Sequence, residues 1–371
     1  MKPAIGNSLT QKIEDYLMEY IASRNLQPGD RIPPLQEIAA AFGASTRPVR
    51  NALENLISKK VLDRRPGKGV FIRETAAGKI KTNAIGILYW SKDEDFYRNP
   101  FYSDVLAGVK LQAEKDEKML LYKSLWNSYE KGTIKENVLN VARKVDGLLV
   151  MELKRDMQAE FLAAYQELSI PAVSMLADGM PGILDSFIFD HGQNVEDVIN
   201  FLSGLGHSRI SYIIRESKFH EQSTMRRSKL RAFSDTLAEA GLAKEACPVI
   251  YLDPADREDN LRQVQELLSG DTRPGAVMCD DDTVAFQVYK AAQSLNIKVP
   301  DDLTVVGYDD LVENRRVEPA LTSVRLPLFE IGEQAIQHLL EKTVSSPVPE
   351  KAPVKVLLRG EIIKRDSHKA V

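Results

Sequence analysis

The apolar positions of the first 73 residues follow a helical spacing before they change to the spacing of short strands. Ile13, Leu17 and Ile21 recur every four residues, which predicts an amphipathic helix from an N-cap at Ser8 to about Arg24. Two further helices are expected before the pattern changes, the first opened by prolines and the second by Ser45. They span residues 35–42, closed by Gly43, and 45–59.

A hairpin follows these three helices. Residues 61–65 and 70–73 are short β-prone runs on either side of Pro66-Gly67-Lys68-Gly69, which is turn chemistry. Residues 1–73 therefore predict a small α+β domain. Residues 74–83 are small and polar without apolar periodicity, so we expect them to form a linker.

From residue 84 onward, short apolar runs alternate with amphipathic helices. This alternation predicts parallel α/β sheets that are covered by helices on both faces. Residues 84–371 are too many for one hydrophobic core of ordinary size, so two subdomains are expected. The predicted strands are 84–90, 146–151, 172–176, 209–214, 275–279 and 303–308.

Charge is distributed unevenly between these parts. The chain carries a net charge of −4, yet residues 1–75 hold 12 Lys and Arg against 8 Asp and Glu. The excess is concentrated between Arg47 and Arg73, where eight residues are basic and only Glu54 and Asp63 are acidic. A single surface lysine or arginine is ordinarily just solvated. Eight that cluster on one helix and one hairpin indicate a DNA-binding surface.

The segment from Leu26 to Ile72 is similar in sequence to a known family of proteins. The text LQPGDRIPPLQEIAAAFGASTRPVRNALENLISKKVLDRRPGKGVFI resembles the GntR family of winged helix-turn-helix regulators. The resemblance implies that the third helix and the hairpin, as recognition helix and wing, face double-stranded DNA. The family has arginine where Gln36 and Thr46 stand, and Arg64 and Arg65 alternate faces, so one of them is expected to pack its stem. The expected DNA contacts are Gln36, Ser45, Thr46, Arg47, Arg50, Asn51, Arg64, Gly67, Lys68 and Gly69.

The longer part of the chain resembles the effector domain of the LacI/GalR family, which shares the fold of periplasmic sugar-binding proteins. The motifs that carry this resemblance include NPFYSDVLAGV, LGHSRI, CDDDTVAF, VPDDLTVVGYDD and EPALTSVRLPLFEIGEQA. A GntR-type head on a LacI-type body is similar to arabinose-repressor-like transcriptional regulators. The resemblance implies a small effector, most simply a sugar.

Carboxylates that follow predicted strands are the first candidates for an effector site. Open α/β sheets bind ligands at the carboxyl ends of their strands, and a carboxylate can accept two hydrogen bonds from sugar hydroxyls. Aromatic side chains before a helix add a stacking surface. At Lys229 the LacI/GalR family has an arginine, a role that Arg226 or Arg227 can also fill. The expected effector contacts are Phe101, Tyr102, Ser223, Arg226, Lys229, Asp281, Asp282 and Asp309.

Local structural roles compete with ligand binding for some of these carboxylates. Asp282 is equally suited to cap a helix that begins at Thr283, and Asp190 is expected to cap the helix that follows it. Asp310 is expected to be a turn residue.

The sequence contains no motif for an enzyme. There is no P-loop, no G-x-S-x-G and no G-x-G-x-x-G after a strand, and the five histidines lack metal-ligand spacing. We therefore predict neither a catalytic residue nor a cofactor nor a metal site. The absence of a signal sequence and of a long apolar run predicts a cytoplasmic protein without a membrane span.

The combined expectation is a homodimeric repressor that binds a palindromic operator and releases it when a sugar-like effector binds. Three alternatives remain at this stage. One is a sugar-binding protein with no DNA role, another is an activator or a co-repressor-type regulator, and the third is a sugar-metabolising enzyme of related fold.

Overall fold

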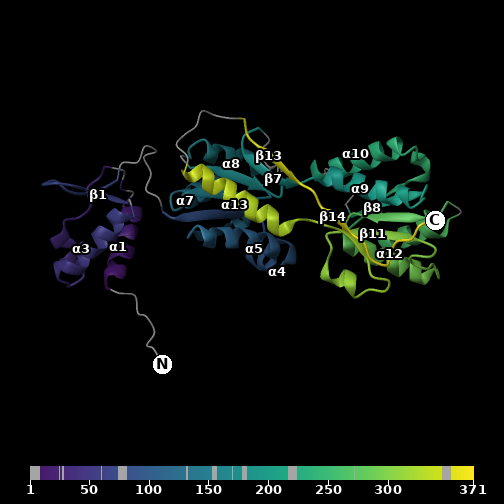
Figure 1. Ribbon diagram of the computed structural model, residues 1–371, viewed down its shortest axis with the longest axis horizontal. Coiled ribbons are helices and arrows are strands. Elements are labelled where there is room, and N and C mark those ends of the chain that lie inside the picture. Colours follow the sequence, from purple (N-terminus) through teal and green to yellow (C-terminus); the bar gives the residue numbers. More distant parts are fainter. Residues whose placement is uncertain are drawn as a thin grey trace, which may run out of the picture. The chain divides into compact units, whose positions relative to one another are not determined.

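The computed structural model describes most of the chain (Figure 1). Residues 74–81 of the predicted linker lie outside the described residues, as do Ser8 and Ser223. The side chain of Arg226 is likewise not described. The described residues are 9–24, 26, 29–59, 61–73, 82–130, 133–152, 157–168, 170–177, 182–215, 224–270, 272–344 and 352–371.

The described residues between 9 and 73 fold as the sequence predicts, into three helices and a hairpin. The apolar stripe of Ile13, Leu17 and Ile21 is buried in the core that these elements share. In the hairpin, Leu62 pairs with Ile72 in antiparallel register. The elements are α1 (Leu9–Ser23), α2 (Leu35–Ala41), α3 (Thr46–Ser58), β1 (Leu62–Arg65) and β2 (Gly69–Ile72).

The turn from α2 to α3 depends on one glycine. Gly43 has a φ of 56°, a left-handed conformation that glycine adopts without steric cost. The Gly43 amide donates to the Ala40 carbonyl at 3.1 Å, and the Ala44 amide donates to the Ala39 carbonyl at 3.0 Å. This pair of bonds is the Schellman motif, which ends α2 and directs the chain into α3. The predicted cap at Gly43 is confirmed.

The remainder of the chain forms two parallel α/β subdomains, as predicted. Backbone contacts divide the chain into two compact units. The first holds residues 1–175, 179–186 and 332–354, and the second holds 176–178, 187–331 and 355–371. The chain therefore passes between the units several times, including at 186–187, 331–332 and 354–355.

One six-stranded sheet has the order β13-β7-β6-β5-β3-β4, and its described pairs from β6 to β4 are parallel. Its strands are β3 (Ala84–Tyr89), β4 (Met119–Ser124), β5 (Gly147–Met151), β6 (Ala172–Met175), β7 (Asp185–Phe189) and β13 (Lys355–Leu358). The helices of this part are α4 (Asp93–Arg98), α5 (Pro100–Lys115), α6 (Trp126–Glu130), α7 (Ile134–Ala142), α8 (Gln158–Tyr165) and α13 (Leu328–Val344), the last of which begins in the second unit.

The other six-stranded sheet has the order β14-β12-β11-β10-β8-β9, parallel except at β14. Its strands are β8 (Ile210–Arg215), β9 (Val249–Leu252), β10 (Ala276–Cys279), β11 (Thr304–Tyr308), β12 (Thr322–Arg325) and β14 (Glu361–Ile363). Its helices are α9 (His191–Gly204), α10 (Thr224–Glu239), α11 (Arg257–Ser269) and α12 (Asp282–Ser294), with 3₁₀ turns at Lys244–Ala246 and Val312–Arg315. Strands β10 and β11 are buried along their whole length, so their carboxyl ends deliver side chains to one edge of a rigid sheet.

Helices α5 and α13 touch through their backbones at Gly332. A Cβ atom built on Gly332 would lie 2.0 Å from the Val105 carbonyl oxygen, which belongs to α5 and cannot rotate away. We expect Gly332→Ala to lower the free energy of unfolding by about 1–3 kcal/mol, because α13 must separate from α5. Urea unfolding measures this loss. Gly204→Ala is the control, since a Cβ at Gly204 meets nothing within 4 Å. Equal stability of the two variants would contradict the prediction.

Candidate functional site

The outward face of α3 presents free cations. Arg47, Arg50 and Asn51 are exposed, while Val49 and Leu53 on the opposite face are buried in the core. Among the described residues, neither Arg47 nor Arg50 has an ion-pair partner. Exposed arginines without an internal carboxylate are free to bind phosphate oxygens and base edges.

The start of α3 offers further polar groups. Gln36, Ser45 and Thr46 are all exposed. Ser45 stands at the N-cap position with extended dihedrals, but its side chain makes no capping hydrogen bond, so the predicted side-chain cap is wrong. The amides of the first turn therefore have no hydroxyl bound to them. The N-terminus of a 13-residue helix in this state favours an anion such as phosphate.

The hairpin turn brings a lysine and two glycines to the surface. Gly67 and Gly69 have φ values of 71° and 116°, which only glycine adopts readily. Lys68 between them is exposed. A Cβ on Gly69 would lie 2.8 Å from the Nε atom of Arg31, so this arginine lies directly against the wing. Arg31 is also exposed and was missed from the sequence, although it stands in the PGDR text before α2.

The two arginines of β1 differ in their contacts. Arg64 forms an ion pair with Glu54 of α3 at 2.6 Å, so the hairpin is tied to the helix and part of the Arg64 charge is neutralised. Arg65 places its guanidinium over the ring of Phe71, 4.6 Å from the centroid. Arg65 thus contacts β2 through its guanidinium, and the expectation that one of the two arginines packs its stem against the helices stays a prediction.

In the second unit, acidic side chains gather at the carboxyl ends of β10 and β11. Asp280, Asp281 and Asp282 follow β10, and Asp309 follows β11. Lys229 reaches the same edge from α10, with its ammonium 2.9 Å from the Asp280 carboxylate. Four of the predicted effector residues, Lys229, Asp281, Asp282 and Asp309, are therefore brought together at one edge of one sheet.

Lys229 is not an open ligand donor. Its side chain is 4% exposed, and its ammonium binds both the carboxylate and the carbonyl of Asp280. The ammonium also lies 3.9 Å from the ring centroid of Tyr308, a cation–π geometry. Tyr212 donates its hydroxyl proton to the same Asp280 oxygen at 3.0 Å. Lys229 therefore neutralises Asp280 and supports Tyr308.

Tyr308 is linked in turn to the start of α9. Its hydroxyl lies 2.8 Å from Asn194 Nδ2 and 2.8 Å from His191 Nδ1. Burial, and after it the nearby Lys229 charge, lower the pKa of His191 to about 3, while Asp280 opposes the shift. The imidazole is therefore neutral near pH 7. Asn194 donates to the Tyr308 oxygen, and the direction of the bond between Tyr308 and His191 Nδ1 depends on the tautomer of the imidazole.

Asp309 is the carboxyl group that this arrangement leaves open. Its φ is 98°, a strained value for an aspartate, and no hydrogen bond to its carboxylate is found within the described part of the chain. Burial raises its pKa to about 7; Lys229 lowers it, and the neighbouring carboxylates Asp280, Asp281 and Asp282 raise it. A half-ionised carboxyl without an internal partner is an acceptor for ligand hydroxyls.

Asp281 and Asp282 serve the fold. Asp281, not Asp282, caps α12 by accepting from the Val284 amide at 2.9 Å, so the predicted cap at Asp282 is wrong. Asp281 also pairs with Arg215 at 2.9 Å. Asp282 is completely buried, which raises its pKa to about 6. It accepts hydrogen bonds from the Leu311 amide, the Asn314 amide group and the Ser323 hydroxyl at 2.7–2.8 Å.

Two further expectations about acidic residues are tested by the contacts. Asp190 caps α9 through the Gln193 amide at 3.0 Å, as predicted. Asp310 has a φ of 51°, which fits its predicted turn role, and it binds Arg325 and Arg365 at 2.8 and 2.5 Å. Of the alternative basic residues near Lys229, Arg227 is exposed.

The first unit holds the two predicted aromatic residues. Phe101 and Tyr102 open α5 and are partly buried, with their ring centroids 5.5 Å apart. Asn99 caps α5 by accepting from the Phe101 amide at 3.0 Å. The Tyr102 hydroxyl donates to Glu152 at 2.6 Å. Glu152 follows β5 with a φ of 52° and was missed from the sequence, because the motif DGLLV ends two residues before it.

Within the described ranges, no three His, Cys, Asp or Glu side chains are grouped as a metal site. No helix in the described part of the chain is long and apolar enough to cross a membrane.

Comparison with known proteins assigns both parts of the chain. Residues 9–72 match the gntR family of bacterial regulatory proteins, and residues 199–368 match a periplasmic binding protein-like domain. The arabinose metabolism transcriptional repressor of Geobacillus stearothermophilus is 24% identical over 367 residues, 97% of each chain. The ribose operon repressor of Haemophilus influenzae is 27% identical over 263 residues, covering 71% of this chain and 75% of the relative.

A solved structure supports the fold of the longer part. The LacI family transcriptional regulator from Enterococcus faecium, with bound ribose, superposes with a TM-score of 0.60. It is 19% identical and covers 78% of this chain and 99% of its own.

The raised pKa of Asp309 predicts a pH-dependent stability. A carboxyl whose pKa rises from 3.8 to about 7 on folding stabilises the fold only while protonated. Its contribution is complete below about pH 4 and is lost as the pH rises through 7. We expect Asp309→Asn to be more stable than the parent by about 1–3 kcal/mol near pH 8, and equal to it near pH 4. Urea unfolding at both pH values measures the difference.

Asp301→Asn is the matched control for this measurement. Asp301 is exposed and hydrogen bonded to Lys369, which lowers the pKa of its carboxyl. The ionised form of Asp301 therefore stabilises the fold, in contrast to Asp309. Asp301→Asn should accordingly gain no stability over the parent near pH 8. A destabilised Asp309→Asn near pH 8 would show that the ionised carboxylate is held by an internal partner.

Proposed function

We propose that this chain, a bacterial DNA-binding regulator with a gntR-family domain and a periplasmic binding protein-like domain, represses carbohydrate-utilisation genes until a sugar binds its second unit. The observation that carries the proposal is the pair of free, exposed arginines, Arg47 and Arg50, on the outward face of α3. Such cations neutralise DNA phosphates at no cost in broken internal ion pairs.

The DNA surface of the proposal is α3 with the wing. Arg47, Arg50 and Lys68 are its cations, to which we add Arg31 because it lies against Gly69. Arg64 has a supporting role in this scheme, since its ion pair with Glu54 holds the wing beside α3. The exposed Gln36, Ser45, Thr46 and Asn51 supply neutral donors and acceptors for base edges or phosphates.

A sugar is the effector class that the second unit supports. Asp309 offers two acceptor oxygens to the hydroxyls of a polyol. Two relatives are named for ribose and arabinose regulation. Phe101 and Tyr102 of the first unit remain candidate effector contacts. Asp281, Asp282 and Lys229 position the loops around Asp309 in this proposal.

Regulation requires that the effector distinguishes two arrangements of the protein. We propose a homodimer on a palindromic operator, in which sugar binding closes the two units about the segments 186–187, 331–332 and 354–355. A ligand changes DNA affinity only by its differential affinity for the two arrangements, typically 1–3 kcal/mol of coupling, or about 5- to 150-fold. This regulator works in the cytoplasm and has no catalytic step.

The DNA surface predicts a charge-specific loss of binding. Arg47→Gln with Arg50→Gln removes two phosphate-binding cations from each subunit, and four from the proposed homodimer, so duplex affinity falls and the slope of log K against log salt decreases by about four. Fluorescence anisotropy with promoter duplex at several salt concentrations measures both quantities. Lys12→Gln removes one cation per subunit from the exposed face of α1 and should leave the slope unchanged. An unchanged slope in the arginine variant would exclude α3 as the DNA surface.

The effector site predicts a variant that binds DNA but does not respond. Asp309→Asn removes the carboxylate acceptor, so pentoses such as arabinose and ribose no longer release the operator, while affinity without sugar stays within about twofold. Anisotropy titration with each sugar tests this. Tighter operator binding by the parent in the presence of sugar would favour the co-repressor alternative. Binding of sugar without any operator binding would favour the alternative without a DNA role.

A further inference from the structure

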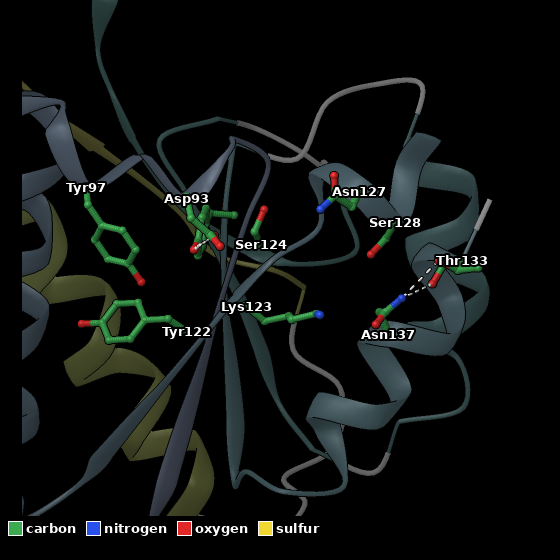
Figure 2. Close-up of a pocket in the computed structure, with 10 residues that line it drawn as sticks. Asp93, Tyr97, Tyr122, Lys123, Ser124, Asn127, Ser128, Thr133 and Asn137 are labelled. Carbon is green, nitrogen blue, oxygen red and sulfur yellow. Dashed lines mark hydrogen bonds between the residues drawn. The ribbon is translucent and has the colours of Figure 1, made fainter. Parts of the chain in front are cut away.

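A polar cavity in the first unit lies outside the proposed effector residues. It measures about 390 Å³, within the range of small-molecule sites, and it is lined entirely by the segments from Tyr89 to Asn137 (Figure 2). A second hollow of about 550 Å³ shares Asp93, Ser124 and Asn127 with it. The two hollows therefore adjoin at these three residues, and together they are called the groove below. None of the predicted effector contacts lines either hollow.

One end of the cavity is cationic. Lys123 is partly buried, and no hydrogen bond or ion pair of its ammonium is found among the described residues. Its side chain points toward the side of the cavity where Asn127, Ser128 and Asn137 lie (Figure 2). Asn137 uses its amide protons on Thr133, so its carbonyl oxygen can only accept, as from a ligand hydroxyl. Among the described residues, no partner of the Asn127 side chain is found, so its amide protons can donate to an anionic group. A half-buried ammonium among neutral amides and hydroxyls is a binding site for an anionic group.

The other end of the cavity suits a hydroxylated ring. Tyr97 and Tyr122 lie there with their rings 6.4 Å apart at 64° (Figure 2). Burial raises the pKa of Tyr122, so its hydroxyl remains a donor near neutral pH. Asp93 accepts the Tyr89 proton on Oδ1 at 2.5 Å, and its second oxygen can accept a ligand hydroxyl. In the adjoining hollow, Trp126 adds a flat apolar surface on which a sugar ring can stack.

We propose that this groove is a second ligand site, which takes an anionic monosaccharide, with the acidic group at Lys123 and the ring between the tyrosines and Asp93. A sugar phosphate and a sugar acid share this chemistry. Through this site, the protein would respond to a second ligand that binds independently of the neutral sugar proposed at Asp309. The inference does not depend on DNA binding, because it concerns a cavity within one unit.

Titration calorimetry on the full chain tests the site with three probes: glucose 6-phosphate, glucuronate and glucose. We expect saturable binding of one or both anionic probes and weaker binding of glucose. Lys123→Gln should weaken the anionic probe about 10- to 100-fold. Asn127→Asp, which places a second negative charge beside the site without breaking an internal hydrogen bond, should weaken it as well. The relative affinities of the phosphate and the carboxylate identify the acidic group.

Lys144→Gln is the matched control, since Lys144 is an exposed lysine of the same unit outside the groove. The affinity of the Lys144→Gln variant for the anionic probe should equal that of the parent protein. No binding of either anionic probe at millimolar concentration would overturn the proposal, as would binding that Lys123→Gln leaves unchanged. Competition between the anionic probe and the sugar that releases the operator would also overturn it, because both would then occupy one site. Operator binding and release that persist in every one of these cases would leave the proposed repressor function standing.

Discussion

The loop that carries Asp309 depends on a buried ion pair between Lys229 and Asp280. Lys229 and Asp280 lie within a few percent of complete burial, and removing either partner would leave an uncompensated charge in the core, at a cost of about 3–5 kcal/mol. The pair fixes the ring of Tyr308 by the cation–π contact and orients Tyr212 by its hydrogen bond. The last residue of β11 is thereby held in one rotamer, and Asp309 follows directly.

The loop after β11 is strained, and its neighbours hold the strain in place. Two successive aspartates, Asp309 and Asp310, have positive φ values, which cost on the order of 1–3 kcal/mol each. Asp310 is clamped by two arginines, and the buried Asp282 accepts three hydrogen bonds from the segments that flank the loop. Within the described part of the chain, Asp280, Asp281, Asp282 and Asp310 are bound internally, whereas Asp309 is not. The contrast supports the proposal that Asp309 faces the ligand more strongly than its position after a strand does.

Local sequence patterns predicted the helices and strands, and they predicted that carboxylates gather at one edge of the second sheet. They did not predict which of these carboxylates are bound internally. The apolar spacing predicted the helices of the head, and Gly43 marked the turn because its conformation is a local property. The carboxylates after β10 and β11 were found because parallel strands end at one edge. The hydrogen bond between Asn194 and Tyr308 joins residues 114 positions apart, and no local pattern carries it. The same limit applies to Arg64, whose pairing with Glu54 depends on how the hairpin packs on α3.

The lysine at position 229 restricts what the effector can be. An arginine at this position would present a planar guanidinium with five N–H donors. One carboxylate cannot satisfy all five, so the remaining donors could bind the ligand. The ammonium of Lys229 is satisfied by Asp280 and the Tyr308 ring, so it offers nothing further. In the proposed site, recognition falls to Asp309, which is an acceptor when ionised. Ligand hydroxyls that donate to Asp309 stabilise its ionised form and lower its pKa from about 7. The proposal therefore implies that effector binding near neutral pH is coupled to release of a proton, and that a ligand without donors gains nothing from Asp309.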